Sequence, residues 1–456
     1  MSKLPRLLIA FLTGLTAAVP AATQSADDDY VRALAAGYEA AFTCSATFNA
    51  GRRLADIQAN ELSRVYAEYR GDIADLTAEI SRSGKFVAVQ YDEDAPPRIA
   101  AWREHLGCAQ LPIGGELGTA ALPYLPLTAS TKAPVGRDPL PRRLDRRYEA
   151  LVRSAFDGET FGPGNRTSAI LIVKNGRIVA ERYARGINAA TPQRTWSVAK
   201  SIAGTVLGVA AHKDIIDIRA PAEVPEWQSR GDPRQRITTE QLMRMASGLT
   251  SDFPGNRTDA IYVGGVAVED NAPGQSLLHR PGTVFRYANN DTLLALYGLR
   301  HALGNDREYL AFPFEELTWK LGMTDTVLET DWRGDFIMSS QVWTTARDLA
   351  RLGLLYLNDG VWQRERLLPR GFVRFVSTPS GPQPDRDWKY GATFWVAGED
   401  TGLPDGTFAA FGNRGQFLVI VPEEDMLIIR RGYDPIGENR GFDITAFSRA
   451  VLDAAD

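Results

Sequence analysis

The chain has 456 residues and a formal charge of −5 at neutral pH, from 51 basic and 56 acidic residues. The basic residues are scattered, so no positive face is built for a nucleic-acid backbone, and nucleic-acid binding is not expected. With 44% hydrophobic and 23% charged residues, the composition is that of a globular protein large enough for two or three domains.

The first residues predict an export signal. Lys3 and Arg6 precede a short apolar run over residues 7–19, and small residues follow over 19–26, where a signal peptidase could cleave. We expect residues 1–26 to be removed and the mature protein to be periplasmic or secreted, without stable insertion in a membrane. The alternative is an uncleaved membrane anchor, although the apolar run is short for a span.

Residues 27–120 are expected to form a small N-terminal domain whose role the sequence does not define. Apolar and aromatic residues at fourfold spacing predict a helix over residues 29–42: Tyr30, Leu34, Tyr38 and Phe42. Alternating apolar residues predict a strand over 86–91. Five prolines between residues 121 and 141 block regular structure and indicate a linker.

Both cysteines of the chain, Cys44 and Cys108, fall in this N-terminal segment. In an exported protein, two cysteines in one small segment indicate a disulfide. Because neither lies near the catalytic motifs below, we interpret the bridge as structural. The alternative is two buried free thiols.

Residues 142–456 carry alternating strand and helix signals. Two β-branched runs flank Asn175 and Gly176, a pair that favours the two-residue turn of a hairpin over residues 168–183. A second hairpin is predicted over residues 415–430. Strands at both ends with helices between them predict an α/β (α+β) sandwich, in which one sheet collects the first and last segments.

Helices are predicted over residues 197–213, 238–246, 349–357 and 443–454. The first contains many small residues, which let a helix pack closely against its neighbours. Thr238 followed by Gln241 is a capping box, and Thr345 followed by Asp348 repeats the pattern with an acid.

Ser197 and Lys200 open the first of these helices. Three residues apart, they lie on one helical face, so the lysine amine can reach the serine hydroxyl. A neutral lysine accepts the hydroxyl proton if burial lowers its pKa, and the helix N-terminus offers N–H groups to an oxyanion. Since this pattern is frequent by chance, the alternative is a capped helix with an exposed lysine.

Tyr287 and Asn289 follow a turn at residues 281–283 and precede an apolar helix over 292–299. A tyrosine at such a corner can present its hydroxyl to a cleft, and a nearby lysine would lower its pKa so that it serves as a base. Asn289 offers a donor and an acceptor to a substrate amide. The alternative is a core tyrosine followed by a helix-capping asparagine.

Taken in this order, Ser197-x-x-Lys200 and Tyr287-x-Asn289 resemble the motifs of the serine β-lactamase and penicillin-binding protein superfamily. The resemblance is greatest to its class C-like branch, which includes esterases, D-aminopeptidases and 6-aminohexanoate-dimer hydrolases, and it covers roughly residues 150–455. It implies a β-lactamase-like antiparallel sheet flanked by helices plus an all-helical subdomain. It also implies that Ser197 is acylated while Lys200 and Tyr287 share the proton transfer.

The third motif of that superfamily departs here from its common pattern. Its counterpart, residues 410–412, ends at Gly412 but lacks the Lys or His that usually stands first, which argues against efficient β-lactamase activity. Arg414 either replaces that charge or is a solvated loop residue. The backbone N–H groups of Ser197 and Asn413 are the candidate oxyanion donors.

The sequence therefore predicts a serine hydrolase that cleaves an amide or ester bond of a small acyl substrate or short peptide. One alternative is a D-Ala-D-Ala carboxypeptidase or β-lactamase, and another is a non-catalytic cell-wall or ligand-binding relative. The four histidines suit neither a Ser–His–Asp triad nor a zinc site, so neither a metal nor another cofactor is expected.

Specificity is expected to depend on loops, in particular residues 251–275. Five aromatic residues near the motifs either wall the cleft or belong to the core: Trp196, Trp227, Tyr262, Trp343 and Trp395.

Overall fold

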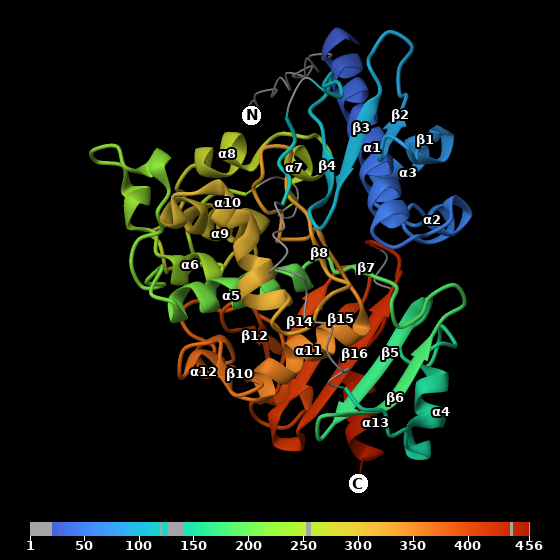
Figure 1. Ribbon diagram of the computed structural model, residues 1–456, viewed down its shortest axis with the longest axis vertical. Helices are drawn as coiled ribbons and strands as arrows, with labels where there is room; N and C mark the ends of the chain where they lie inside the picture. The colour runs from blue at the N-terminus through green and yellow to red at the C-terminus, as the bar shows by residue number, and fades with distance from the viewer. Residues whose placement is uncertain (1–20, 119–120, 126–139, 252–256, 438–440, 456) are drawn as a thin grey trace, which may run out of the picture.

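The structure, a computed structural model, describes residues 21–118, 121–125, 140–251, 257–437 and 441–455, with residues 21–27 as backbone only. Most of the predicted signal segment, residues 1–20, and most of the predicted linker, residues 126–139, lie outside the described part. None of the helices in these ranges has the length and apolar character needed to cross a membrane. Three regions lie side by side: an N-terminal region, a helical region and a large sheet (Figure 1).

Residues 21–111 form what we call the N-terminal module, in which α1 packs on a four-stranded antiparallel sheet. Its elements are α1 (Ala21–Phe48), α2 (Leu54–Asn60), α3 (Ala67–Asp75), β1 (Ala78–Ser81), β2 (Phe86–Val89), β3 (Arg98–Arg103) and β4 (Gly107–Gln110). Helix α1 is longer than predicted because no proline interrupts it, and Gly51, with a φ of 61°, follows its end. The predicted disulfide is confirmed, since Cys44 of α1 is bonded to Cys108 of β4.

A seven-stranded antiparallel sheet forms the centre of the other part of the chain. In spatial order its strands are β12 (Trp388–Tyr390), β13 (Trp395–Ala397), β14 (Phe408–Gly412), β15 (Gln416–Val421), β16 (Met426–Gly432), β5 (Thr167–Lys174) and β6 (Arg177–Tyr183). The predicted turn joins β5 to β6, and Asn175 and Gly176 have positive φ angles of 49° and 66°. Strand β16 pairs with β5, so the first and last segments share one sheet as predicted.

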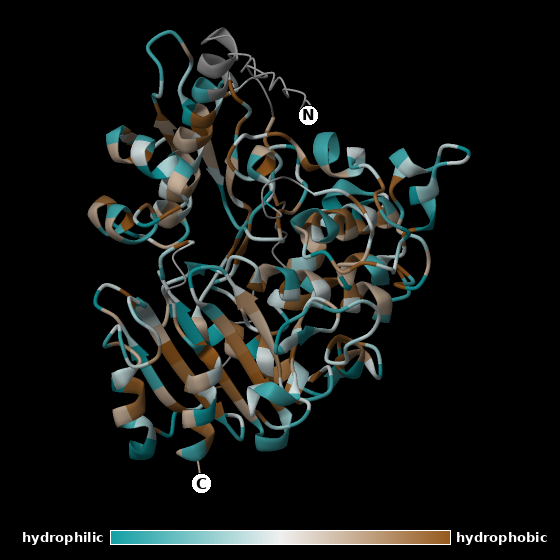
Figure 2. Ribbon diagram, turned by 180° about the vertical axis from the view of Figure 1, so that it is seen from behind, coloured by the Kyte–Doolittle hydropathy of each residue, from teal (hydrophilic) through white to brown (hydrophobic). Residues whose placement is uncertain are grey.

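Helices cover both faces of this sheet, because successive residues of a strand point to opposite sides. Ile170 and Ile172 of β5 share an apolar cluster with residues of α4 (Glu149–Ser154) and α13 (Ile444–Asp453). Leu171 and Val173 share another with residues of α5 (Val198–His212) and α11 (Ala346–Leu357). The central strands are accordingly hydrophobic along most of their length (Figure 2).

Between β6 and β12 the chain forms a helical subdomain beside α5 (Figure 1). Its helices are α6 (Thr239–Met243), α7 (Asp259–Tyr262), α8 (Val268–Asn271), α9 (Asn289–Leu303) and α10 (Asp306–Pro313). The predicted capping box is present, because the side chains of Thr238 and Gln241 each accept a hydrogen bond from the other residue's backbone N–H. The predicted α/β (α+β) class, an antiparallel sheet flanked by helices with a helical subdomain, is confirmed.

Short elements complete the described chain. A three-stranded sheet orders β7 (Gln193–Arg194), β9 (Val342–Thr344) and β8 (Val327–Leu328), and β10 (Val361–Trp362) pairs with β11 (Glu365–Arg366). Helix α12 (Phe372–Val376) precedes β12. Single helical turns lie at Arg146–Tyr148, Pro225–Trp227, Pro233–Arg236, Ala272–Gly274, Phe314–Thr318, Glu399–Thr401 and Pro422–Glu424. As predicted, the Thr345 side chain caps α11 by accepting from the Asp348 N–H.

The N-terminal module shares a continuous apolar core with the rest of the chain. Tyr38 and Phe42 of α1 belong to the same buried cluster as Trp196 and Val198, which flank the start of α5. Gly37 makes this packing close, because a Cβ there would lie 2.1 Å from the Val263 carbonyl oxygen. The module therefore packs directly against the region that carries the sequence motifs.

Candidate active site

Ser197 immediately precedes α5, at the point where the three-stranded sheet leads into the helix. The residue before it, Trp196, has a φ of 51°, a left-handed conformation that is costly for a large side chain and is held by the surrounding packing. The small residues of α5 act as predicted: a Cβ on Gly204 would lie 2.0 Å from the Thr393 hydroxyl oxygen. The helix is therefore held against its neighbours, with the Ser197 hydroxyl at its N-terminus.

Lys200 is buried beneath Ser197, with 1% of its surface exposed. Its Nζ lies 2.9 Å from the Ser197 Oγ, and it donates to the Asn289 Oδ1 and to the Ser339 carbonyl oxygen, each at 2.7 Å. Burial lowers the pKa of the Lys200 ammonium to about 7, because no carboxylate compensates the lost hydration. A lysine in this state can act as a base near neutral pH.

Tyr287 faces the serine from the other side. The Ser197 side chain lies close enough to its hydroxyl to lower the pKa of Tyr287, and its ring centroid lies 5.0 Å from the Lys200 Nζ. The expectation of a lowered pKa is wrong: burial raises the pKa of Tyr287 to about 12, although the Ser197 hydrogen bond and Arg386 oppose the rise. At neutral pH the Tyr287 hydroxyl is therefore protonated, whereas the Lys200 amine is able to accept a proton.

Asn289 is the first residue of α9, and its Oδ1 accepts a hydrogen bond from Lys200. The sequence assigned this side chain to a substrate amide. In the structure its acceptor oxygen instead fixes the lysine, although Asn289 also lines the pocket.

Gly412, the last residue of β14, brings this strand close to the serine. A Cβ on Gly412 would lie 2.2 Å from the Thr195 carbonyl oxygen and 3.2 Å from the Ser197 backbone nitrogen. Glycine is thus required where β14 runs beside the start of α5. Asn413 follows directly and lines the same pocket, so its N–H and that of Ser197 are in neighbouring segments, as an oxyanion hole requires.

Arg414 takes neither of its predicted roles. Only 3% of its surface is exposed, and its guanidinium donates to the carbonyl oxygens of Glu61, Ser63, Tyr433 and Asp434. It is therefore a buried structural residue, because carbonyl groups of two separate segments converge on it. It does not line the pocket and does not replace the missing third-motif cation.

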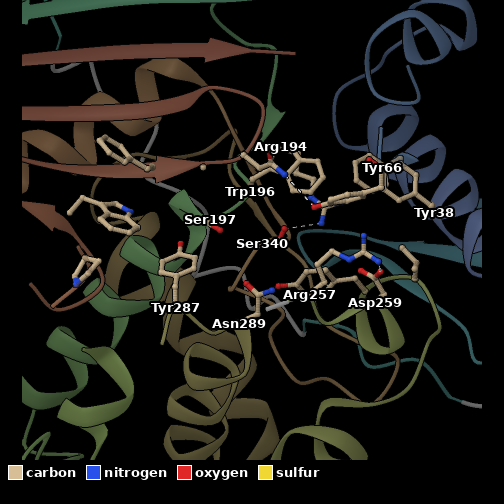
Figure 3. A pocket seen from close by; sticks show the side chains of 18 of the residues that line it. Tyr38, Tyr66, Arg194, Trp196, Ser197, Arg257, Asp259, Tyr287, Asn289 and Ser340 are labelled. Atoms are coloured by element: carbon tan, nitrogen blue, oxygen red, sulfur yellow. Dashed lines mark hydrogen bonds and ion pairs between the residues drawn. The ribbon is translucent and has the colours of Figure 1, made fainter. Parts of the chain in front are cut away.

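A pocket of about 430 Å³ contains Ser197 and Tyr287. One wall comes from the N-terminal module, through Tyr38, Phe42 and Tyr66, which sequence reasoning had not placed in the site (Figure 3). Tyr38 and Phe42 are one turn apart on α1, a spacing that fits a core face equally well, so no sequence signal distinguished the two roles. Figure 3 shows Tyr38 and Tyr66 beside Arg194, on the side of the pocket away from Tyr287.

The loop predicted to set specificity contributes to the same wall. Arg257, Asp259 and Tyr262 line the pocket, while residues 252–256 lie outside the described part. Arg257 and Asp259 pair with each other at 2.5 Å, and Asp259 also accepts from the Tyr69 hydroxyl at 2.6 Å.

The opposite wall, around Tyr287, is aromatic and carries one cation. Trp395 stacks on Tyr287 with ring centroids 5.5 Å apart, and the Arg386 guanidinium carbon lies 4.2 Å from the Trp395 ring centroid. Burial lowers the pKa of Arg386 while the neighbouring Tyr287 and Asp387 oppose the shift, but no carboxylate among the described residues forms a salt bridge with it. Of the five predicted aromatic candidates, three line the pocket, Trp196, Tyr262 and Trp395, whereas Trp227 and Trp343 are fully buried in the core.

Known proteins share this arrangement of elements. A curated 6-aminohexanoate-dimer hydrolase of Paenarthrobacter ureafaciens is 24% identical over 369 residues, which cover 75% of this chain and 90% of that protein. A solved Bacillus anthracis structure, named as a 6-aminohexanoate-dimer hydrolase, matches with 23% identity and a TM-score of 0.57 over 70% of this chain and 87% of its own. A family VIII carboxylesterase matches with 15% identity and a TM-score of 0.55, over 68% and 97%.

At these identities the solved structures show that the fold is shared. The sequence model of the Beta-lactamase family matches residues 152–430, more than half of the chain, and leaves the N-terminal module outside the match. That range includes Ser197, Lys200, Tyr287 and Gly412. The chain therefore belongs to the Beta-lactamase family, as the sequence motifs predicted.

Proposed function

We propose that this protein is a serine hydrolase that cleaves an amide or ester bond of a small acyl substrate through an acyl-enzyme on Ser197. The observation that carries the proposal is the 2.9 Å contact between the Ser197 Oγ and the buried Lys200 amine. A buried amine with a pKa of about 7 loses its charge easily near neutral pH, so it can accept the proton of a neighbouring hydroxyl.

In the first step the Ser197 Oγ attacks the substrate carbonyl carbon while Lys200 takes the hydroxyl proton. The negative oxygen of the tetrahedral intermediate is held by the N–H groups of Ser197 and Asn413. The bond to the leaving group then breaks, and Tyr287 donates a proton to the departing nitrogen or oxygen. The Lys200 ammonium returns a proton to Tyr287, so the net transfer is from the Ser197 hydroxyl to the leaving group.

In the second step water attacks the acyl carbon and gives its proton to Lys200. The carbon–Oγ bond breaks, and Lys200 returns that proton to Ser197. The free acid is released, and both residues are restored. Tyr287 stays protonated throughout this step, as its raised pKa requires.

The aromatic wall near Tyr287 supports a more specific substrate class. If Tyr287 protonates the leaving group, that group lies beside Trp395 and Arg386. The Arg386 guanidinium, which stacks on Trp395 and forms no salt bridge among the described residues, is complementary to a carboxylate, so we expect the substrate to carry a carboxylate in its leaving portion. Arg386 thus takes the role that the sequence had offered to Arg414.

The same proposal places the mature protein in the periplasm or outside the cell. The Cys44–Cys108 disulfide supports this location, because such bonds form and persist in oxidising compartments.

The test is a substrate panel of p-nitrophenyl esters, linear amide oligomers, D-peptides and nitrocefin. We expect hydrolysis of at least one ester or amide, with loss of turnover in Ser197→Ala. Ser154→Ala is the matched control, since Ser154 lies on α4 and its hydroxyl donates to the Leu151 carbonyl of the same helix. Turnover that persists in Ser197→Ala would overturn the proposal, and rapid nitrocefin hydrolysis would show a β-lactamase instead.

A further inference from the structure

The N-terminal module contacts the turn that carries the second oxyanion donor. This turn, residues 413–415, joins β14 to β15. The Arg414 guanidinium reaches from the turn into the module, where its Nη1 donates to the Glu61 carbonyl oxygen at 3.0 Å and its Nη2 to the Ser63 carbonyl oxygen at 2.8 Å. Its Nε donates to the Asp434 carbonyl oxygen at 3.0 Å, so one planar group fixes the turn between two segments.

A second contact holds the donor residue itself. The Asn413 Nδ2 donates to the Tyr66 hydroxyl of the module at 3.3 Å, and the Asn413 Oδ1 accepts from the Arg414 N–H at 2.8 Å. Arg414 has a φ of 57° and the next residue, Gly415, one of 75°. A left-handed backbone is costly for a non-glycine residue such as Arg414, and the contacts of its side chain with the module offset part of this cost.

The module also contacts the segment that carries the first oxyanion donor. The Trp196 ring lies 5.7 Å from the Phe42 ring and 6.5 Å from the Tyr66 ring, measured between centroids. The Arg194 guanidinium carbon lies 4.2 Å from the Phe42 ring centroid and 4.4 Å from that of Trp196. The left-handed Trp196, directly before Ser197, is thus held against α1.

The module is firmly attached to the region it contacts. The Cys44–Cys108 disulfide ties α1 to β4, and Glu329, outside the module, accepts from the Ser45 hydroxyl at 2.6 Å and from the Asn49 Nδ2 at 2.9 Å. A module held in this way can keep both donor segments in fixed positions.

We infer that the N-terminal module is a positioning element of the active site, which sets the spacing between the Ser197 and Asn413 N–H groups. This inference rests on the proposed function. It gives the module a role beyond covering the catalytic region. Oxyanion stabilisation requires donors placed at hydrogen-bond distance from the developing charge. Loosening one donor therefore lowers kcat strongly and affects substrate binding less.

The test uses Tyr66→Phe and Arg414→Lys. Tyr66→Phe keeps the ring that packs on Trp196 but removes the hydroxyl that accepts a hydrogen bond from Asn413. Arg414→Lys replaces the guanidinium, which binds several carbonyl groups at once, by a single ammonium group. We expect kcat for a p-nitrophenyl ester to fall about 5- to 20-fold in each variant, with KM changed less than about 2-fold. Matched controls within the module are Tyr91→Phe and Arg32→Lys, which leave the turn untouched.

A boronic acid that forms a tetrahedral adduct on Ser197 gives the second readout. We expect its inhibition constant to weaken by the same factor as kcat, while the product acid binds as before, a pattern that general loosening of the fold would not produce. If Arg414→Lys fails to fold, as judged by thermal melting, Tyr66→Phe still decides the question.

Wild-type kcat and boronate affinity in folded Tyr66→Phe and Arg414→Lys would overturn the inference while leaving the proposed function intact. If the wild-type protein neither turns over any ester or amide nor is acylated, the proposed function fails and the positioning role fails with it.

Discussion

The Nζ of Lys200 and the Oδ1 of Asn289 lie 2.7 Å apart. A neutral lysine has two N–H groups and one lone pair. When Lys200 is neutral, Asn289 and the Ser339 carbonyl accept its two N–H groups, so its lone pair is left for the Ser197 hydroxyl 2.9 Å away. The asparagine of the second motif therefore orients Lys200, and in the proposed mechanism the neutral amine is the form that accepts the Ser197 proton.

The first prediction concerns pH. Because burial disfavours the ammonium, Lys200 is protonated below about pH 7 and neutral above it. We expect kcat/KM for a neutral ester to rise about tenfold per pH unit on the acid side and to level off above about pH 7. Initial rates between about pH 5 and pH 9 check this. A limb that rises only near the ordinary lysine pKa would contradict it.

Tyr287→Phe separates the two proton-transfer roles. An amide leaving group must be protonated as it departs, whereas p-nitrophenolate leaves without a proton. We expect Tyr287→Phe to lower kcat for amides by about 10²- to 10⁴-fold and for p-nitrophenyl esters by less than about 10-fold. Parallel kinetics on one amide and one ester with the same acyl group make the comparison. Equal losses on both substrates would show that Tyr287 is not the acid.

Gly412→Ala tests the contact between β14 and the start of α5. The added methyl carbon would lie 2.2 Å from the Thr195 carbonyl oxygen, so the strand must move away from Ser197. We expect a loss of about 10²-fold in kcat with the fold retained, because the oxyanion donors separate. Gly71→Ala is the control, since a Cβ there meets no atom within 4 Å. Unchanged kcat in Gly412→Ala would place the oxyanion donors elsewhere.

Arg386→Gln tests the substrate class. If Arg386 binds a carboxylate in the leaving portion, the variant loses about 10- to 100-fold in kcat/KM on such substrates. This factor corresponds to the free energy of one hydrogen bond to a charged group. The same substrates with that carboxylate amidated should be hydrolysed equally by both proteins. Arg370→Gln, on the exposed surface, is the matched control. A loss of equal size on both forms would refute carboxylate binding.

The disulfide is expected to stabilise the N-terminal module. It closes a loop of 64 residues between α1 and β4, and a bridge of this kind contributes about 2–5 kcal/mol to the free energy of unfolding. Urea denaturation of the Cys44→Ala, Cys108→Ala double variant beside the wild type measures the difference. Identical free energies of unfolding would show that the bridge contributes nothing.

Local chemistry made a large part of the fold predictable. The turn at Asn175 and Gly176 is specified by its two residues, and the capping box at Thr238 by residues three apart. The contact between Ser197 and Lys200 follows from helical spacing alone. Each of these features depends on neighbours within four positions, which a sequence displays directly.

The features that sequence reasoning missed depend on distant contacts. The sequence offered Arg414 as a cation for the site, but its guanidinium binds carbonyl groups, two of them some 350 positions away in the chain. A nearby lysine was expected to lower the pKa of Tyr287, yet burial raises the pKa of Tyr287 to about 12 and lowers that of Lys200 to about 7. Tyr38 and Phe42 have a spacing that suits a core face as well as a pocket wall. Burial and long-range packing decide such cases.

Covalent labelling with a fluorophosphonate, followed by peptide mapping by mass spectrometry, tests whether Ser197 is the nucleophile. We expect one adduct per chain, on the peptide that contains Ser197, formed more slowly below about pH 7 and absent in Ser197→Ala. A protein that stays unlabelled, or one labelled at another residue with Ser197 unmodified, would contradict it.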